Sequence, residues 1–289
     1  MSLRFVEAFQ SPGAQSGRRL IAVECASSGI GARAAIEFAR HGCKLSLGGR
    51  NKDNLEIVRS KCHEVLPSSF EILTSVGDIT KDTDRKSLVE RTVETFGQID
   101  VLINNAGRGA GHTSELFSQV EAETLDVMFS INVFSHVLVT KLAIPHLIKT
   151  KGCVVNISSV WSTVPAVGAG VCCMTKASVD MFTKVLAAEM AQYGVRVNSI
   201  NPGSVPTNLT RGRNGPTTTS PGDEPDISEL NQKYSEYSLP MHPLGRLGSV
   251  YDVSHALLFL SSENSSFITG QHLYVDGGRS LRGEYLAYV

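Results

Sequence analysis

The chain has 289 residues, of which 42% are hydrophobic and 19% charged, and its formal net charge is -1. This length is sufficient for one sizeable core, and the near-neutral charge gives no reason to expect a nucleic acid or an anionic membrane surface as a partner. Six cysteines without a C-x-x-C pair or regular spacing argue against a disulfide framework and a zinc site, so we expect reduced thiols and no metal.

The N-terminal stretch of residues 1–17, "MSLRFVEAFQSPGAQSG", lacks the apolar core of a signal peptide and is expected to be an extension of the domain. No uninterrupted apolar run in the chain approaches the roughly 18 residues that cross a bilayer. We therefore expect a soluble, cytoplasmic protein with no membrane partner.

Short apolar runs alternate with longer amphipathic segments along the chain. This alternation is typical of βαβ units, in which helices cover both faces of a parallel sheet. We expect strands at residues 19–23, 43–48, 70–76, 99–105, 152–158, 196–201 and 272–276. We expect helices over residues 29–42, 122–149, 171–192 and 250–261. The predicted fold is α/β: one Rossmann-type domain over residues 18–280, with a doubly wound sheet of seven mostly parallel strands.

Residues 206–245 break this alternation, because they are rich in Pro, Gly, Thr and charged residues. A connection of this length inside a compact domain is usually functional or disordered. We expect a lid over a substrate pocket, and the alternative is a tolerated surface loop. Residues 281–289 are expected to form a C-terminal tail.

A glycine-rich turn, "VECASSGIGARAA", follows the first expected strand. Gly29, Ile30 and Gly31 open the first helix, where backbone N–H groups at the positive helix end can hold a pyrophosphate. The turn resembles the Thr-Gly-x-x-x-Gly-Ile-Gly motif of the short-chain dehydrogenase/reductase family. Glu24 stands at the threonine position and Cys25 at the position of the first glycine.

Both departures have physical consequences. A Cβ and a sulfur at Cys25 should crowd the approach that glycine leaves open to a cofactor. If the Glu24 carboxylate faces the pyrophosphate at about 6 Å, each like-charge pair costs about 2 to 3 kcal/mol at an effective dielectric near 20. That cost corresponds to about a hundredfold in affinity. The alternative is that Glu24 points to solvent or to a partner group and that Cys25 is a small buried hydrophobe.

The end of the second strand indicates which dinucleotide is bound. Gly49 leaves no carboxylate for an adenosine 2'-hydroxyl, and Arg50 supplies a cation that suits the 2'-phosphate of NADP. We therefore predict NADP rather than NAD as the cofactor. The alternative is that Arg50 is a solvated charge at the strand end.

The resemblance to the family extends from about residue 18 to about residue 280. Asp78 resembles the adenine-contacting aspartate of the family, Asn104–Gly107 ("NNAG") is a specific match, and Asn201–Thr207 ("NPGSVPT") resembles the segment that holds the nicotinamide carboxamide. The cofactor-binding residues implied by the resemblance are Cys25, Ser27, Ser28, Gly29, Ile30, Gly31, Arg50, Asn51, Asp78, Ile79, Asn105, Ala106, Gly107, Lys176, Pro202, Gly203, Val205 and Thr207.

The resemblance also implies an oxidoreductase that transfers a hydride between NADP(H) and a small-molecule carbonyl or secondary alcohol. The family uses an asparagine, a serine, a tyrosine and a lysine for this chemistry. Asn132, Ser159 and Lys176 match three of these positions, and Cys172 stands at the position of the tyrosine. The usual interval of about thirteen residues after Ser159 confirms this register, and the spacing of four places residues 172 and 176 on one helical face.

A thiol projects several ångströms less than a phenol, whereas a proton donor must come within about 3 Å of the oxygen or act through one water. Loss of a general acid typically costs about 10² to 10⁴ in rate, so turnover through Ser159 and a bridging water stays physically allowed. One hypothesis is therefore an impaired oxidoreductase. The other is a degenerate relative that serves as a binding or regulatory module or as a silent subunit, because the departures fall on the chemistry and spare the scaffold.

Three further expectations concern the surroundings of this constellation. Trp161 either walls the substrate pocket or packs in the core. A tyrosine from another segment, Tyr234 or Tyr237, could fill the place left by Cys172. The helices over 122–149 and 171–192 are expected to pair copies of the chain into a homodimer or tetramer, with a hetero-oligomer possible. The apolar stripe proposed for this contact consists of Met174, Met181, Val185 and Met190.

Overall fold

The computed structural model describes residues 19–66, 70–109, 116–207, 221–223 and 236–281. Its centre is a 7-stranded sheet in the order β3-β2-β1-β4-β5-β6-β7. The strands are β1 Leu20–Val23, β2 Lys44–Gly49, β3 Ile72–Val76, β4 Val101–Asn104, β5 Cys153–Ile157, β6 Arg196–Pro202 and β7 His272–Val275. Every neighbouring pair is parallel, which confirms the predicted α/β sheet and makes it fully rather than mostly parallel.

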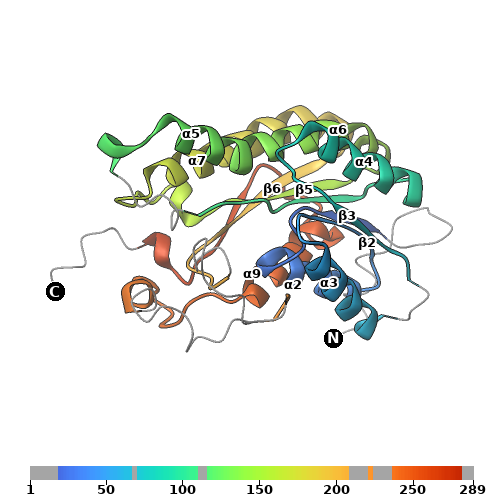
Figure 1. Ribbon diagram of the computed structural model, residues 1–289, viewed down its shortest axis with the longest axis horizontal. Coiled ribbons are helices and arrows are strands. Elements are labelled where there is room, and N and C mark those ends of the chain that lie inside the picture. Colours follow the sequence, from blue (N-terminus) through green and yellow to red (C-terminus); the bar gives the residue numbers. More distant parts are fainter. Residues whose placement is uncertain (1–18, 67–69, 110–115, 208–220, 224–235, 282–289) are drawn as a thin grey trace.

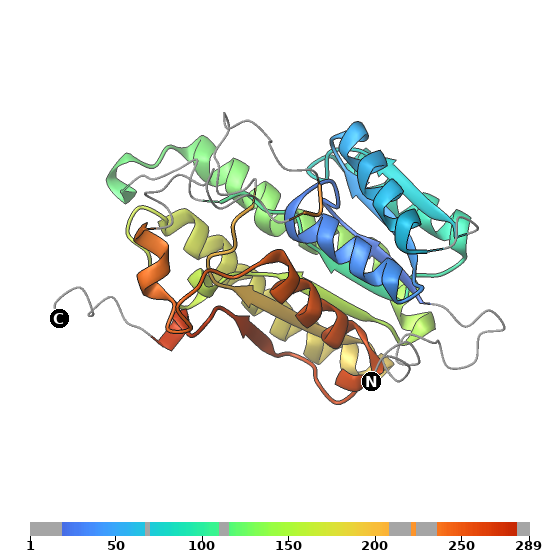
Figure 2. The same cartoon turned by 90° about the horizontal axis from the view of Figure 1, so that it is seen from below.

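Helices cover both faces of the sheet (Figure 1). One face carries α2 Gly29–Arg40, α3 Lys52–Val65 and α9 Val250–Ser261. The other carries α4 Asp82–Phe96, α5 Ala122–Phe129, α6 Ser135–Thr150 and α7 Gly170–Met190. Seen from below, α2 and α9 lie side by side against the sheet (Figure 2). We gave no bounds for α3 and α4 from the sequence, although the alternating pattern requires helices there.

The sheet separates two hydrophobic cores, and β1 shows how one strand serves both. Ile21 and Val23 belong to the core beneath α2 and α9, whereas Leu20 and Ala22 belong to the core beneath α6 and α7. Successive side chains of a strand point to opposite faces, so a strand buried on both faces is apolar throughout. This is why the parallel strands appear in the sequence as continuous apolar runs.

The predicted helix over residues 122–149 is continuous but not uniform. A π-helical segment, η3 Ser130–Phe134, joins α5 to α6. Such bulges within α-helices are frequent at functional sites. Here the segment contains Asn132, whose side chain is fully buried.

The same continuous helix, Ala122–Thr150, is long and apolar enough to cross a membrane, with a mean hydropathy of 1.7 in its most apolar window. Polar residues such as Asn132 and Lys141 interrupt its apolar positions, so the sequence contains no continuous apolar run there. Its buried residues, including Val139, Ala143 and Leu147, pack in the core beneath the sheet, which explains its composition without a membrane.

The segment predicted to be a lid, residues 206–245, lies largely outside the described residues, as do residues 1–17 and nearly all of the expected tail. Its described middle, residues 221–223, lies against the helices α2 and α3. A Cβ added at Gly222 would come within 2.5 Å of Ile36, and the Asp223 carboxylate pairs with Lys61 at 2.7 Å. This part of the insert therefore covers the helices behind the glycine-rich turn.

Candidate active site

The predicted site residues gather at the carboxyl edge of the sheet, where strands β1 to β6 end. The glycine-rich turn after β1 is anchored to both neighbouring strands. The Glu24 amide donates to the Ile103 carbonyl at 3.1 Å, and the Ala26 amide donates to the Gly48 carbonyl at 2.8 Å. The Asn105 side chain donates to the carbonyls of Glu24 and Cys25, each at 3.2 Å. These bonds hold the turn in one conformation.

Cys25 adopts a left-handed backbone conformation with φ of 51°. This conformation favours glycine and costs other residues about 1 to 2 kcal/mol. Cys25 therefore has the backbone conformation that the expected glycine motif would place here. Burial is the main cause that raises the pKa of the Cys25 thiol to about 12, so this thiol is neutral and unreactive at physiological pH.

Glu24 does not point to solvent. Its side chain is fully buried, and neither carboxylate oxygen accepts a well-formed hydrogen bond from the described residues, although the Ala106 amide lies close enough to favour the charged form. Burial raises the pKa of Glu24 well above its usual range, and the Ala106 amide and the Arg85 charge oppose the increase only partly. Burial of Glu24 beside the NNAG segment therefore favours its protonated form, which carries no negative charge.

The first turn of α2 fits a pyrophosphate. Gly31 packs so closely that an added Cβ would lie 2.5 Å from Asn105 Nδ2 and 2.6 Å from the Cys25 carbonyl oxygen. Ser28, at the N-cap, makes no side-chain capping bond in the described structure, which leaves the first N–H groups of the helix to a ligand. Ser27 and Ile30 flank these groups and are partly exposed.

The adenosine end of the site lies after β2 and β3. Arg50 is exposed directly after β2, and Asn51 caps α3 by accepting from the Asn54 amide at 2.9 Å. Asp78 accepts from the Thr80 amide and hydroxyl at 3.0 and 2.8 Å. Burial by itself would raise the pKa of Asp78, but the two Thr80 bonds and the Arg50 charge outweigh this effect and lower the pKa. The neighbouring Ile79 is partly exposed. A cation and a carboxylate therefore face the same region.

The segment after β6 returns over the glycine-rich turn. A Cβ added at Gly29 would lie 3.3 Å from the Thr207 side chain, so Thr207 sits directly above the turn. The Gly203 amide donates to the Val275 carbonyl at 3.1 Å, and Arg279 donates to the Ser204 hydroxyl at 2.5 Å. Strand β7 and the residues after it thereby hold this segment, which also contains Pro202 and Val205, in place.

Asn132 joins two parts of the site. Its side-chain oxygen accepts from the Arg108 amide at 2.7 Å, and its amide donates to the Arg108 carbonyl at 3.1 Å and the Thr175 hydroxyl at 3.0 Å. Arg108 follows Gly107 of the NNAG segment, and Thr175 precedes Lys176. The asparagine therefore fixes the NNAG segment against α7.

Ser159 begins a short 3-10 helix, η4 Val160–Ser162, and its hydroxyl oxygen accepts from the Trp161 amide at 3.2 Å. The hydroxyl hydrogen makes no bond within the described structure and can be donated to a substrate oxygen. Trp161 packs against the small apolar cluster that also contains Cys172, and its indole N–H has no partner among the described residues. Trp161 thus lies beside Cys172 and is partly core, and a role as a wall of the substrate pocket stays a prediction.

Lys176 extends its amine from α7 back to the sheet, where it donates to the Ile157 carbonyl at 2.8 Å. A Cβ at Gly107 would lie 3.9 Å from this nitrogen, so the amine and the NNAG segment are close neighbours. Burial lowers the pKa of Lys176, and the neighbouring Cys172 and Asp180 oppose the decrease. The amine can donate its remaining hydrogens to a ligand hydroxyl.

Cys172 lies one turn before Lys176 and is 3% exposed. It packs with Met128, Ala169 and Val171. No tyrosine hydroxyl among the described residues bonds to Ser159 or Lys176: Tyr237 is 67% exposed, and the Tyr274 hydroxyl bonds to Thr163. Tyr234 lies outside the described residues. Within the described structure, a short, buried thiol therefore stands one turn before Lys176, where the resemblance led us to expect a tyrosine.

A histidine that we did not select from the sequence also belongs to the site. His136 is fully buried, and its Nε2 lies 2.9 Å from the Ala106 carbonyl oxygen. Because a carbonyl only accepts, Nε2 carries the hydrogen and Nδ1 is a bare acceptor. Burial and the Lys176 charge lower the pKa of His136 to about 3, so it is neutral. Its position four residues after Asn132, on the same helical face, was the available signal.

Comparisons with known proteins agree with this geometry. A family model described as enoyl-(acyl carrier protein) reductase matches residues 25–280. Glucose 1-dehydrogenase from Gluconobacter oxydans is 33% identical over 272 residues, covering 93% of this chain and 94% of the relative.

Two solved structures have the same fold and are each 30% identical to this chain. The 3-ketoacyl-(acyl-carrier-protein) reductase of Brucella melitensis, complexed with NADH, has a TM-score of 0.76. The match covers 91% of this chain and 98% of the Brucella chain. A short-chain dehydrogenase/reductase of unknown function from Caenorhabditis elegans, with cofactor, has a TM-score of 0.81. The match covers 94% of this chain and 98% of the Caenorhabditis chain. Since both the family model and these relatives span nearly the whole domain, the chain belongs to the short-chain dehydrogenase/reductase family of oxidoreductases.

Proposed function

We propose that this protein binds NADP(H) and transfers a hydride between it and a small carbonyl compound or secondary alcohol, at a rate limited by the missing tyrosine. The observation that carries the proposal is the convergence of Asn132, Ser159 and Lys176 beside the glycine-rich turn. When bound, the nicotinamide supplies the hydride. The Brucella and Caenorhabditis relatives, solved with NADH and with cofactor, support a nicotinamide cofactor here.

The chain's own residues have separate tasks in this proposal. The first turn of α2 holds the pyrophosphate, and Lys176 donates to a ribose hydroxyl. Ser159 donates its hydroxyl hydrogen to the substrate oxygen and orients it, and Asn132 fixes the NNAG segment against α7. With Cys172 too short to reach the oxygen, the proton comes from water at Ser159.

Preference for NADP(H) rests on Arg50, which is exposed at the end of β2 where no acidic residue follows directly. Titration of the protein's fluorescence with NADPH and NADH measures the preference. Charge-assisted hydrogen bonds contribute about 1.5 to 3 kcal/mol, so Arg50→Ala should weaken NADPH binding at least about tenfold. NADH affinity should change little. Equal loss for both dinucleotides would contradict this role for Arg50.

A second candidate function is favoured by Cys172: a catalytically silent member that binds the dinucleotide or pairs with an active subunit. Oxidation of NADPH in the presence of a panel of aldehydes and ketones separates the two. Measurable turnover supports the oxidoreductase. Tight NADPH binding without turnover supports the silent binding protein. If the protein showed neither binding nor turnover, the proposal that it uses NADP(H) would be wrong.

We also propose a homo-oligomer formed through α6 and α7. Phe134, at the end of η3, and Leu138, on α6, are 53% and 37% exposed, and Met174, Met181 and Val185 on α7 are 43% to 59% exposed. The prediction that Met190 belongs to this stripe is wrong, because Met190 is only 9% exposed and packs in the core against the sheet. Light scattering tests the proposal: Met181→Glu should yield monomers, and a monomeric wild type would contradict it.

A further inference from the structure

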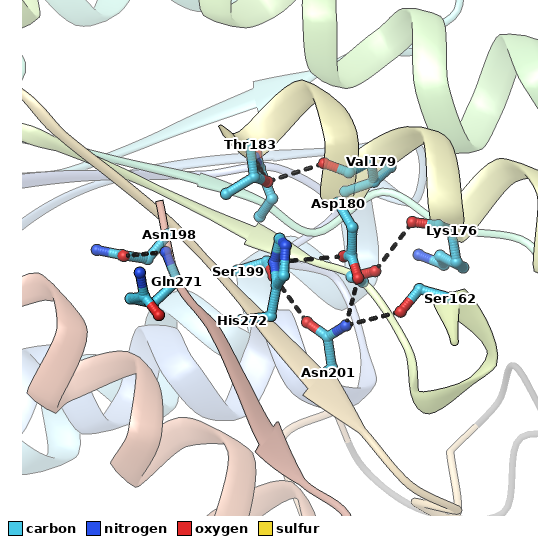
Figure 3. Close-up of polar contacts among 12 residues, drawn as sticks. Ser162, Lys176, Val179, Asp180, Thr183, Asn198, Ser199, Asn201, Gln271 and His272 are labelled. Carbon is cyan, nitrogen blue, oxygen red and sulfur yellow. Dashed lines mark hydrogen bonds and ion pairs between the residues drawn. The ribbon is translucent and has the colours of Figure 1, made fainter. Parts of the chain in front are cut away.

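The side chain of Asn201, on β6, lies between α7 and the short helix η4 that follows Ser159 (Figure 3). Its amide nitrogen donates to Asp180 Oδ2 at 2.9 Å, to the Ser162 hydroxyl at 2.9 Å and to the Ser159 carbonyl at 3.2 Å. Asn201 is fully buried, and Asp180 is 7% exposed. One amide group therefore connects strand β6 to α7 and to both ends of η4.

The hydrogen bonds around Asn201 determine the orientation of its amide. The Ser159 carbonyl only accepts, so the atom that faces it is the NH₂ group and not the side-chain oxygen. The side-chain oxygen of Asn201 accepts from the Ser199 hydroxyl at 2.7 Å. This hydroxyl has one hydrogen, so it accepts in turn from His272 Nδ1, which lies 2.7 Å away. Both ends of the amide are thus engaged, which leaves Asn201 a single orientation.

The bond to Asp180 restrains the Asn201 amide further. An ionised carboxylate makes shorter hydrogen bonds than a neutral acceptor, and these are roughly twice as strong. Asp180 Oδ1 makes no hydrogen bond among the described residues, whereas Oδ2 accepts from Asn201. Movement of the amide away from Asp180 would leave a buried acceptor without its partner, which is unfavourable.

Ser159 and η4 form one hydrogen-bonded unit. The Trp161 amide donates to the Ser159 hydroxyl oxygen at 3.2 Å, and the Ser162 amide donates to the Ser159 carbonyl at 3.0 Å. Asn201 bonds to this unit at the Ser159 carbonyl and at the Ser162 hydroxyl. It therefore restrains both the backbone of the serine and the last residue of the helix that bonds to the serine hydroxyl.

We propose that Asn201 is a positioning residue for Ser159, whose hydroxyl it directs toward the substrate oxygen by holding the serine carbonyl and the end of η4. The proposal rests on the proposed function in so far as Ser159 is to orient a substrate oxygen. Because Cys172 supplies no phenol, Ser159 is the donor that the proposed function leaves at that oxygen. Its placement then matters more than in a site that keeps both donors.

The fluorescence of Trp161, the one tryptophan of the chain, reports on η4 without a cofactor. The indole packs against the apolar cluster that contains Cys172, so its exposure depends on the position of η4. Asn201→Ala removes the amide and should release η4. We expect Trp161 emission to shift to longer wavelength and its quenching by acrylamide to increase relative to the wild type.

Asn198→Ala is the matched control, because Asn198 is a comparably buried amide three residues earlier on β6 (Figure 3). It donates to the Ile268 carbonyl at 2.9 Å and accepts from the Gln271 amide at 3.0 Å, and neither partner belongs to η4. Asn198→Ala should lose stability but keep the wild-type emission and quenching. An equal change in Asn198→Ala, or no change in Asn201→Ala, would overturn the proposal.

If Asn201→Ala does not fold, Asn201→Leu combined with Asp180→Leu takes its place. Replacing both partners of a buried hydrogen bond by apolar groups of similar shape can be nearly neutral for stability. The double variant also removes the amide from η4, so the same rise in Trp161 quenching is expected. Wild-type quenching in the folded double variant would contradict the role of Asn201.

Kinetics give the second measurement. A displacement of about 1 Å can cost about 10²-fold in rate, so Asn201→Ala should lower kcat for NADPH oxidation at least about tenfold. In the Ser159→Ala background the same substitution should change kcat by less than about twofold, because no hydroxyl is left to position. A tenfold loss that persists in this background would mean that Asn201 does not act through Ser159.

The two measurements also separate this proposal from the proposed function. If the wild type shows no turnover with any carbonyl compound, the proposed function fails. The fluorescence of Trp161 in Asn201→Ala then still decides whether Asn201 holds Ser159 and η4 in place.

Discussion

The glycine-rich turn and the start of α7 have both lost residues expected in the family, but the two regions respond differently. In the turn, Cys25 takes the left-handed conformation of the missing glycine, and Asn105 holds the carbonyls on either side. On α7, Cys172 keeps the helix and its packing but brings no hydroxyl to the site. A backbone conformation can be kept when a side chain changes, whereas a side-chain hydroxyl cannot.

The two regions also differ in the property that is affected, which is stability in one and catalysis in the other. In the turn, the departures act on stability, through backbone strain at Cys25 and a buried acid at Glu24. For position 172 we propose an effect on catalysis rather than on stability, because the buried thiol packs well in an apolar cluster. Substitutions at position 172 should therefore change the rate, and substitutions at Glu24 or Cys25 should change the stability.

The largest effect is expected at position 172. Cys172→Tyr returns a phenol to the face of Lys176, so the rate of NADPH oxidation with a reducible carbonyl should rise about 10²- to 10⁴-fold. Cys172→Phe is the matched control, since it adds the same ring without a hydroxyl. Both variants insert volume beside Trp161 and Met128 and should lose about 1 to 3 kcal/mol of stability. Equal rates for Tyr and Phe would show that the proton does not pass through this position.

A smaller effect is expected at Glu24. Because its folded pKa is raised above the unfolded value of about 4.3, the folded state binds the extra proton, and stability falls as pH rises above that value toward the folded pKa. Glu24→Gln keeps the shape and removes the ionisation. We expect it to stabilise the protein by about 1 to 3 kcal/mol at pH 8, with little change at pH 4.

Denaturant unfolding at pH 4, 6 and 8 measures this difference. Glu94→Gln, which removes the same charge from an exposed site on α4, should leave the pH dependence unchanged. If Glu24→Gln were no more stable than the wild type at pH 8, Glu24 would have to be ionised and compensated in the folded state.

The smallest effect is expected at Cys25. Cys25→Gly relieves about 1 to 2 kcal/mol of left-handed strain but adds about 0.5 to 1 kcal/mol of unfolded-state entropy. A net stabilisation of up to about 1 kcal/mol should result. NADPH affinity should also rise, because the sulfur leaves the approach to the turn.

Lys151→Gly provides the control for Cys25, since Lys151 is the other non-glycine residue with positive φ in the described structure, at 50°. It ends α6, far along the chain from the turn, and should gain similar stability without any change in NADPH affinity. If NADPH affinity rose for both variants, or for neither, the Cys25 sulfur would have no specific effect on cofactor binding.

The amino-acid sequence by itself determined the sheet and the edge at which the site forms. Apolar runs buried on both faces specify parallel strands, and the carboxyl ends of such strands meet at one edge, so the motifs after β1, β2, β4 and β6 had to converge. Spacing along one helix placed residues 172 and 176 on one face. These inferences need only local periodicity and the geometry of one element.

Only the tertiary structure decided where individual side chains point and which distant groups they meet. Glu24 turned into the protein beside Ala106, Met190 into the core, and Asp180 toward Asn201 and His272, whose positions are 21 and 92 residues further along the chain. These contacts depend on the register of the sheet and on the angle at which each helix packs. Many residues contribute to the free energies that determine the register and the angle, so no single sequence motif predicts the contacts.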